Sequence, residues 1–198
     1  MGGVAVRGIE ADWEALWAPY DDATYRSVLE HIGAEDFVLD IGAGDLRLAR
    51  RMIEKCRKVY AIEIQEELIN TAFTDANNQP SEKLVVIQGD AKLLPFPQDV
   101  TVGVLLMRHC THFQLYANKL REAGAERLIT NARWRMGVEV VQLGTARIPY
   151  QELTLGWYAC WCGKVGFKPG PVDRLRTEII NMTHEVDGCP HCLGLDDV

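Results

Sequence analysis

The sequence has no long apolar segment. Its longest purely apolar stretch runs from Val102 to Met107, whereas a membrane-spanning helix needs roughly 20 residues. No apolar region follows a basic start at the N-terminus, and Val6 stands where a myristoylation signal has Ser or Thr. We therefore expect a cytoplasmic protein without a membrane segment.

An excess of basic residues is also missing. The 198 residues include 21 Lys and Arg against 28 Asp and Glu, a formal net charge of -7, and no run of like charges forms a tail. This balance disfavours non-specific binding to nucleic acid.

Internal repeats and low-complexity segments are absent too, and a hydrophobic content of 47% is typical of a globular chain. Against a typical domain of about 150 residues, the length predicts one domain with an appendage.

The six cysteines do not suggest a disulfide framework, because a reducing cytoplasm keeps thiols free. Cys56 and Cys110 are isolated. The other four form two close pairs late in the chain: Cys160, Cys162, Cys189 and Cys192.

Short apolar runs alternate with helical stretches through the middle of the chain, which is typical of a parallel sheet with helices on its faces. The expected strands are 37–41, 59–64, 84–88, 100–107, 127–130 and 138–143. We expect an α/β fold with a mostly parallel, Rossmann-like sheet. The predicted division is an N-terminal helical segment (1–35), an α/β core (36–146) and a C-terminal cysteine-rich β extension (147–198), with β-like stretches at 157–167 and 177–186.

Two helix starts can be predicted from their capping residues. Asp21 or Asp22 is placed to cap a helix before the core. After the fourth strand, Thr111 and Gln114 have the spacing of a capping box, which predicts a helix that starts at His112.

A glycine loop follows the first predicted strand, with Asp40, Gly42 and Gly44 at its turn. Glycines there let a ligand approach the backbone at the carboxyl end of a strand. Glu63 ends the second strand, nineteen residues after Gly44, where a carboxylate can accept ribose hydroxyls. The third strand ends before Asp90 and Ala91. Three strands thus present polar groups to one crevice.

The stretches Val38-Leu-Asp-Ile-Gly-Ala-Gly-Asp, Tyr60-Ala-Ile-Glu-Ile and Gln88-Gly-Asp-Ala resemble class I S-adenosylmethionine-dependent methyltransferases over residues 36–130. The resemblance implies a cofactor site in which the loop lines the methionine end, Glu63 binds the ribose and Asp90 with the Ala91 backbone addresses the adenine. The family commonly has a small residue at the position that Leu46 occupies in this chain. An NAD-dependent dehydrogenase is the rival interpretation, but its fingerprint has a third small residue where this chain has Arg47.

Residues 40–64 also resemble ribosomal RNA adenine dimethylases of the same superfamily. Those enzymes carry a motif after the fourth strand that grips an exocyclic amine, and this chain has Met107-Arg-His-Cys110 there. We therefore expect a methyltransferase with a small-molecule or protein acceptor. The alternatives are an RNA methyltransferase and a non-catalytic cofactor-binding or zinc-mediated interaction protein. The acceptor and the oligomeric state stay open.

Side chains near the crevice are candidates for the chemistry, although methyl transfer depends mainly on positioning. His109 and His112 follow the fourth strand and are the predicted catalytic residues, with His112 as a candidate general base. Trp17, Tyr20 and Tyr25 are candidates for a lid over the cofactor, but aromatics that anchor a helix to the sheet are at least as good an interpretation. Arg133, Trp134 and Arg135 follow the fifth strand and are weaker candidates for contact with an acidic or aromatic substrate, because such a cluster is more often a solvated loop.

The two cysteine pairs are separated by twenty-six residues, enough for a hairpin that returns the second pair to the first. Four thiolates predict a structural, tetrahedral zinc. The Cys160–Cys162 spacing is short for this purpose and requires a bend at Gly163. Three alternatives stay open. One cysteine is replaced as ligand by His184 or His191, the cysteines are ordinary reduced thiols, or the second pair is a redox motif.

Overall fold

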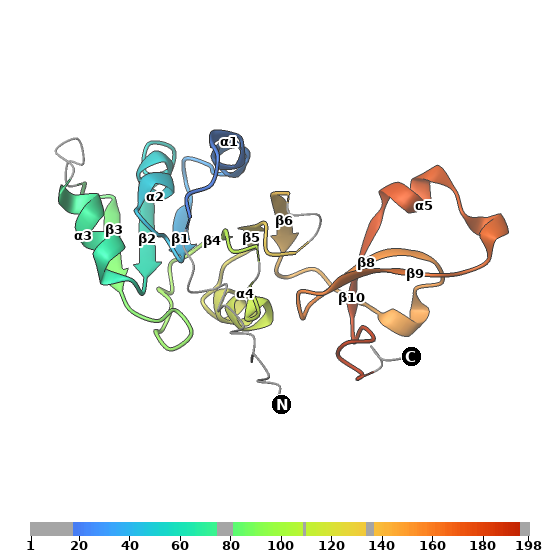
Figure 1. The fold of residues 1–198 in the computed structure, drawn as a ribbon. Coiled ribbons are helices and arrows are strands. Elements are labelled where there is room, and N and C mark those ends of the chain that lie inside the picture. Colours follow the sequence, from blue (N-terminus) through green and yellow to red (C-terminus); the bar gives the residue numbers. More distant parts are fainter. Residues whose placement is uncertain (1–17, 75–80, 109, 134–136, 195–198) are drawn as a thin grey trace, which may run out of the picture.

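The structure is a computed structural model that describes residues 18–74, 81–108, 110–133 and 137–194. Two sheets lie side by side (Figure 1). The larger has the strand order β3-β2-β1-β4-β5-β6. Its strands are β1 (Phe37–Ile41), β2 (Lys58–Glu63), β3 (Leu84–Gln88), β4 (Val102–Leu105), β5 (Arg127–Thr130) and β6 (Glu139–Gln142).

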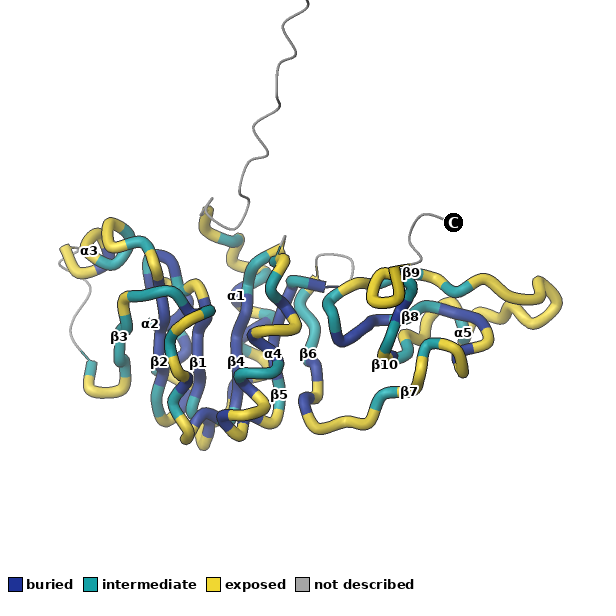
Figure 2. The backbone as a smooth tube through the Cα atoms, turned by 90° about the horizontal axis from the view of Figure 1, so that it is seen from below, coloured by how far each residue is buried: buried dark blue, intermediate teal, exposed yellow. Residues whose placement is uncertain are grey.

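The first five strands are parallel and β6 runs antiparallel to β5, which confirms the expected mostly parallel sheet. Neighbouring residues in β1 serve opposite faces, as the period of two requires: Val38 joins one apolar cluster and Leu39 the other. All but the edges of this sheet are buried (Figure 2). Parallel strands buried on both faces explain the continuous apolar runs in the sequence.

Helices cover both faces of the large sheet. The helices are α1 (Asp22–Glu30), α2 (Arg47–Met52), α3 (Glu66–Thr74) and α4 (Phe113–Glu122). The first three contribute to one apolar cluster and α4 to the other. Close contact fixes α4, since a Cβ on Gly103 of β4 would lie 2.3 Å from Leu120 Cδ1. Among the described helices, none is both long and apolar enough to cross a membrane.

The helix starts agree only in part with the capping predictions. Asp21 caps α1 as expected, because its carboxylate accepts a hydrogen bond from Thr24 N at 2.7 Å. The predicted capping box at Thr111 is wrong. His112, and not Thr111, is the N-cap of α4, and it makes no side-chain capping bond. The Thr111 hydroxyl lies 3.1 Å from His112 Nδ1.

The smaller sheet has the order β7-β10-β8-β9. Its elements are β7 (Ile148–Pro149), η2 (Tyr150–Glu152), β8 (Gly156–Cys160), β9 (Val165–Lys168), η3 (Val172–Arg174), α5 (Thr177–Asn181) and β10 (Thr183–Asp187). The predicted strand 157–167 is a hairpin of β8 and β9, and the first half of the predicted strand 177–186 is helix α5. The expected hairpin return is also wrong. Because β10 runs parallel to β8, the chain must cross over through η3 and α5 to reach it.

The two sheets are joined by buried polar contacts. Arg133, with a side chain only 1% exposed, donates hydrogen bonds to both carboxylate oxygens of Glu139 and of Glu185. Trp161 Nε1 donates to Asn118 Oδ1 of α4. Arg133 is therefore an internal ion-pair partner, and its predicted contact with a substrate is wrong. Trp134 and Arg135 lie outside the described residues.

Candidate functional site

The glycine loop has backbone angles that favour glycine. Gly42 and Gly44 have φ values of 73° and 56°, in the left-handed region. The amides of Gly42 and Ala43 both donate to Ile62 O, at 2.9 and 3.0 Å. These bonds fasten the loop to the end of the neighbouring strand β2.

A cavity of 520 Å³ lies at this edge of the sheet. Because the strands are parallel, their carboxyl ends meet there. Of the predicted cofactor residues, Asp40, Gly42, Glu63, Asp90 and Ala91 line the cavity, whereas Gly44 does not. The structure thus brings together the ends of three strands that the sequence singled out.

Asp40 is a buried polar group of this site. It is 3% exposed, and its Oδ2 has no hydrogen-bond partner within the described structure. Burial, together with the nearby negative charge of Glu63, raises the pKa of Asp40 to about 7. A buried, unpaired carboxylate at a cavity wall is poised to accept a cationic ligand.

Glu63 holds the glycine loop in place. Its Oε2 accepts the Gly44 amide at 2.8 Å, and its Oε1 accepts the amides of Ile64 and Gln65, both at 2.9 Å. A carboxylate offers about four lone-pair sites, so one is left for a ligand. Glu63 can therefore accept one hydrogen bond from a ligand hydroxyl while it keeps all three hydrogen bonds from backbone amides.

Asp90 begins a tight loop at the end of β3. Its Oδ1 accepts the Lys92 amide at 2.8 Å, and its carbonyl accepts the amides of Leu93 and Leu94. Gly89 must lack a side chain, because it has a φ of 152° and a Cβ there would lie 2.8 Å from Leu94 Cδ1.

Two tyrosines of the N-terminal segment stand at the cavity. Tyr20 and Tyr25 both line it. The Tyr20 hydroxyl accepts the Arg108 amide at 3.3 Å, and the Arg108 guanidinium lies 5.1 Å from the Tyr20 ring centroid. The segment before α1 therefore reaches the loop after β4. Trp17, the third member of the predicted lid, lies outside the described residues.

Of the two predicted catalytic histidines, His112 is not among the described residues that line the cavity. His109 lies outside the described residues. His112 is half-buried, and its ring is 6.4 Å from that of Tyr116, which does line the cavity. Tyr116, one turn into α4, was not singled out from the sequence, because nothing in the sequence indicates how the helix faces the cavity.

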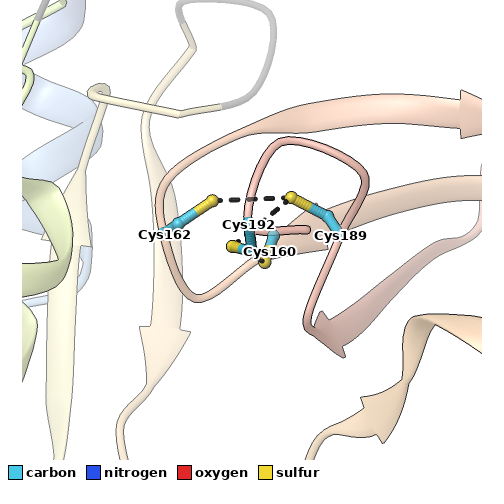
Figure 3. Close-up of side chains that lie close together, drawn as sticks. All are labelled: Cys160, Cys162, Cys189 and Cys192. Carbon is cyan, nitrogen blue, oxygen red and sulfur yellow. Dashed lines mark hydrogen bonds between the residues drawn. The ribbon is translucent and has the colours of Figure 1, made fainter. Parts of the chain in front are cut away.

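The four late cysteines form a compact cluster (Figure 3). Their sulfurs all lie within 4.8 Å of one another. The distances are 3.6 Å for Cys162–Cys189, 3.7 Å for Cys189–Cys192 and 3.8 Å for Cys160–Cys192. Gly163 supplies the required bend with a φ of 96°. The described His, Asp and Glu side chains do not join the cluster, so His184 and His191 are not needed as ligands.

Comparison with known proteins bears directly on the large sheet. The sequence model of the family described as "Methyltransferase domain" matches residues 38–130. Over these residues the chain is similar to a methyltransferase domain. The matched residues span β1 to β5 and include Asp40, Glu63 and Asp90 at the cavity, whereas Tyr20 and Tyr25 precede them. S-adenosylmethionine is the cofactor of the class I methyltransferases that these residues resemble, and Asp40 Oδ2, which has no partner in the described structure, fits the cationic amino group of that molecule.

A curated relative is the probable ribosomal RNA small subunit methyltransferase A of Methanococcoides burtonii, 34% identical over 83 residues, which are 39% of this chain. The chain spans 29% of that relative's length. Among solved structures, the chain is similar to the YcgJ protein of Bacillus subtilis (20% identity, TM-score 0.49, 56% of this chain and 50% of that one). A SAM-dependent methyltransferase of Aquifex aeolicus is similar over 54% of this chain and 61% of that one (21% identity, TM-score 0.41).

Proposed function

We propose that this protein transfers the methyl group of S-adenosylmethionine to an acceptor bound at the cavity mouth. The observation that carries the proposal is Asp40, a buried carboxylate at the cavity whose Oδ2 has no partner. The cofactor supplies a methyl group on a positively charged sulfonium. The protein supplies position and shielding from water.

Each strand end has a separate task in this proposal. Asp40 pairs with the amino group at the methionine end of the cofactor. Glu63 accepts a ribose hydroxyl at its remaining lone-pair site. Asp90 and the Ala91 backbone address the adenine. His109 and His112 are proposed as the groups nearest the acceptor, with His112 as the candidate base.

Titration calorimetry tests the cofactor assignment. We expect S-adenosylhomocysteine to bind and NAD not to bind. E63Q should weaken binding because it removes the charged acceptor that fixes the loop, whereas E35Q is a matched control, since Glu35 forms an exposed ion pair with Arg57. Binding of NAD alone, or equal affinity in E63Q and wild type, would refute the assignment.

The acceptor class needs its own experiment. We propose a small molecule or a protein, because Met107-Arg-His-Cys110 lacks the amine-gripping motif and the net charge is -7. The ribosomal RNA methyltransferase named above supports RNA as the second candidate. Labelled cofactor incubated separately with metabolite, peptide and RNA pools distinguishes them by which pool gains label. A protein that binds the cofactor but labels no pool would fit the non-catalytic alternative.

We further propose that Cys160, Cys162, Cys189 and Cys192 bind a structural zinc ion. A tetrahedral zinc with Zn–S bonds of about 2.3 Å places its sulfurs about 3.8 Å apart. Three sulfur pairs of the cluster lie at 3.6 to 3.8 Å, and all four sulfurs lie within 4.8 Å of one another. Four sulfur ligands leave no open position, so the metal has no catalytic role. Elemental analysis should find one zinc per chain. A protein purified without any stoichiometric metal would disprove this proposal.

A further inference from the structure

Lys119 on α4 makes an unusual set of contacts. Its ammonium donates to three backbone carbonyls: Ala91 O at 2.5 Å, Leu94 O at 2.6 Å and Lys92 O at 3.1 Å. An ammonium has three donors, so all of them are used on one short loop. Nothing in the sequence pattern pointed to this lysine.

The loop held by Lys119 is the one that follows Asp90. Its amides are fixed by Asp90, which accepts from Lys92, Leu93 and Leu94. Its carbonyls are fixed by Lys119. The backbone of residues 91–94 is therefore held from both sides, and Ala91 within it lines the cavity.

The surroundings of Lys119 strengthen these bonds. The ammonium lies 4.4 Å from the ring centroid of the buried Phe96. Desolvation lowers the pKa of Lys119, although the charges of Asp90 and Glu122 oppose the shift. Hydrogen bonds from a charged donor are stronger when little water competes for it.

The helix that carries Lys119 is itself fixed. The next residue, Leu120, packs against Gly103 of β4. The preceding residue, Asn118, accepts the hydrogen bond of Trp161. Because both neighbours are tied to other elements, the lysine stem starts from a defined position.

We propose that Lys119 is a positioning residue of the cofactor site, which sets the backbone of residues 91–94 so that Ala91 can receive the adenine. It does not line the cavity and acts through the loop alone. The role rests on the proposed function, since it requires that the cavity binds an adenosyl cofactor.

The test compares S-adenosylhomocysteine affinities of wild type, K119M, K119R and K83M by calorimetry. Lys83 is the matched control, because its ammonium also caps backbone carbonyls, those of Ile53 and Cys56, but at the opposite edge of the sheet. Thermal unfolding of each variant is measured in parallel. We expect K119M to weaken binding at least about tenfold, the scale of one lost charged hydrogen bond, K119R to recover part of the loss, and K83M to bind normally.

Each of the other possible results decides against the proposed role of Lys119. Equal affinity in K119M and wild type overturns the role of Lys119 and leaves the proposed function standing. Equal losses in K119M and K83M mark a general effect on stability and overturn it too. If K119M does not fold and K119R binds as wild type does, Lys119 is a folding residue only. Absence of binding to wild type removes the proposed function and this role together.

Discussion

Trp161 Nε1 donates a hydrogen bond of 2.9 Å to Asn118 Oδ1 and so connects the cysteine cluster to helix α4. The indole stands between Cys160 and Cys162 in the chain, and the guanidinium groups of Arg147 and Arg121 lie 3.8 and 5.3 Å from its ring. The side chain is 7% exposed. One residue therefore links the proposed metal site, two cations and the helix beside the cofactor cavity.

Replacing Trp161 by Phe should destabilise the protein. W161F keeps an aromatic ring near the two arginines but removes the indole donor to Asn118 Oδ1, which then keeps the longer bond from Arg121 at 3.4 Å, so the change costs about 1 to 2 kcal/mol. Urea unfolding measures the change. N118A in the W161F background is the control, since it should add little once the bond is gone. Fully additive losses would show that the two residues do not interact.

The pH dependence of stability should change in D40N. The pKa of Asp40 in the folded protein is about 7, above its ordinary value of 3.8. Between these values the folded state holds a proton that the unfolded state has lost, so this contribution to stability falls as pH rises from about 4 to about 7. At pH 8, D40N should exceed wild type in stability by on the order of 2 to 4 kcal/mol. Urea unfolding at pH 5 and pH 8 tests this, and an identical pH dependence in both proteins would contradict it.

The affinity of wild type for a cationic ligand should rise with pH, whereas its stability falls. D40N should lose this affinity. A cationic amino group favours ionised Asp40, so wild type should bind S-adenosylhomocysteine more tightly as pH rises through 7. D40N should bind it weakly at every pH. Methylthioadenosine, which lacks the amino acid end, is the matched probe and should bind both proteins alike. A similar loss for both ligands would show that Asp40 does not act at the methionine end.

The cysteine cluster predicts a difference between two serine variants. C192S removes one of four proposed ligands, so it should lose zinc and lower the melting temperature of the extension. C110S is the control, because Cys110 lies outside the cluster. Native mass spectrometry and thermal unfolding measure both effects. Equal metal content in the two variants would show that Cys192 is not a ligand.

Two opposing effects on stability act at Leu46, namely its left-handed backbone conformation and the burial of its side chain. Its φ is 64°, a left-handed conformation that costs a non-glycine residue about 1 to 2 kcal/mol, yet its side chain is fully buried among α1, α2 and β1. Removing a buried leucine side chain costs about 2 to 5 kcal/mol. L46G should therefore lower the free energy of unfolding by up to about 4 kcal/mol, as measured in urea. A variant more stable than wild type would mean that backbone strain dominates.

Much of the large sheet could be predicted because its strands are buried on both faces and their apolar runs are unmistakable. The ends of β1, β2 and β3 could be predicted for the same reason: parallel strands bring Asp40, Glu63 and Asp90 to one edge whatever the loops do. The proposed boundaries at residues 35 and 146 stay predictions.

The remaining features depend on contacts that periodicity does not encode. Arg133 reads as a solvated loop residue, but Glu185, fifty-two positions later, neutralises it. In the sequence, Lys119 has the pattern of a surface lysine on an amphipathic helix. Its contacts become evident only when the path of residues 91–94 is known. The stretch 177–181 has β-branched residues yet forms a helix, because the crossover to a parallel β10 needs a compact connection.

The spacing of the four sulfurs also has a consequence for handling the protein. Without a metal, Cys162–Cys189 and Cys160–Cys192, at 3.6 and 3.8 Å, need to approach by less than about 2 Å to reach disulfide bonding distance. Oxidised glutathione would accept two electrons from each pair and be released as two reduced molecules. The four sulfurs proposed to bind zinc are then open to oxidation, and either bound zinc or added reductant should protect them.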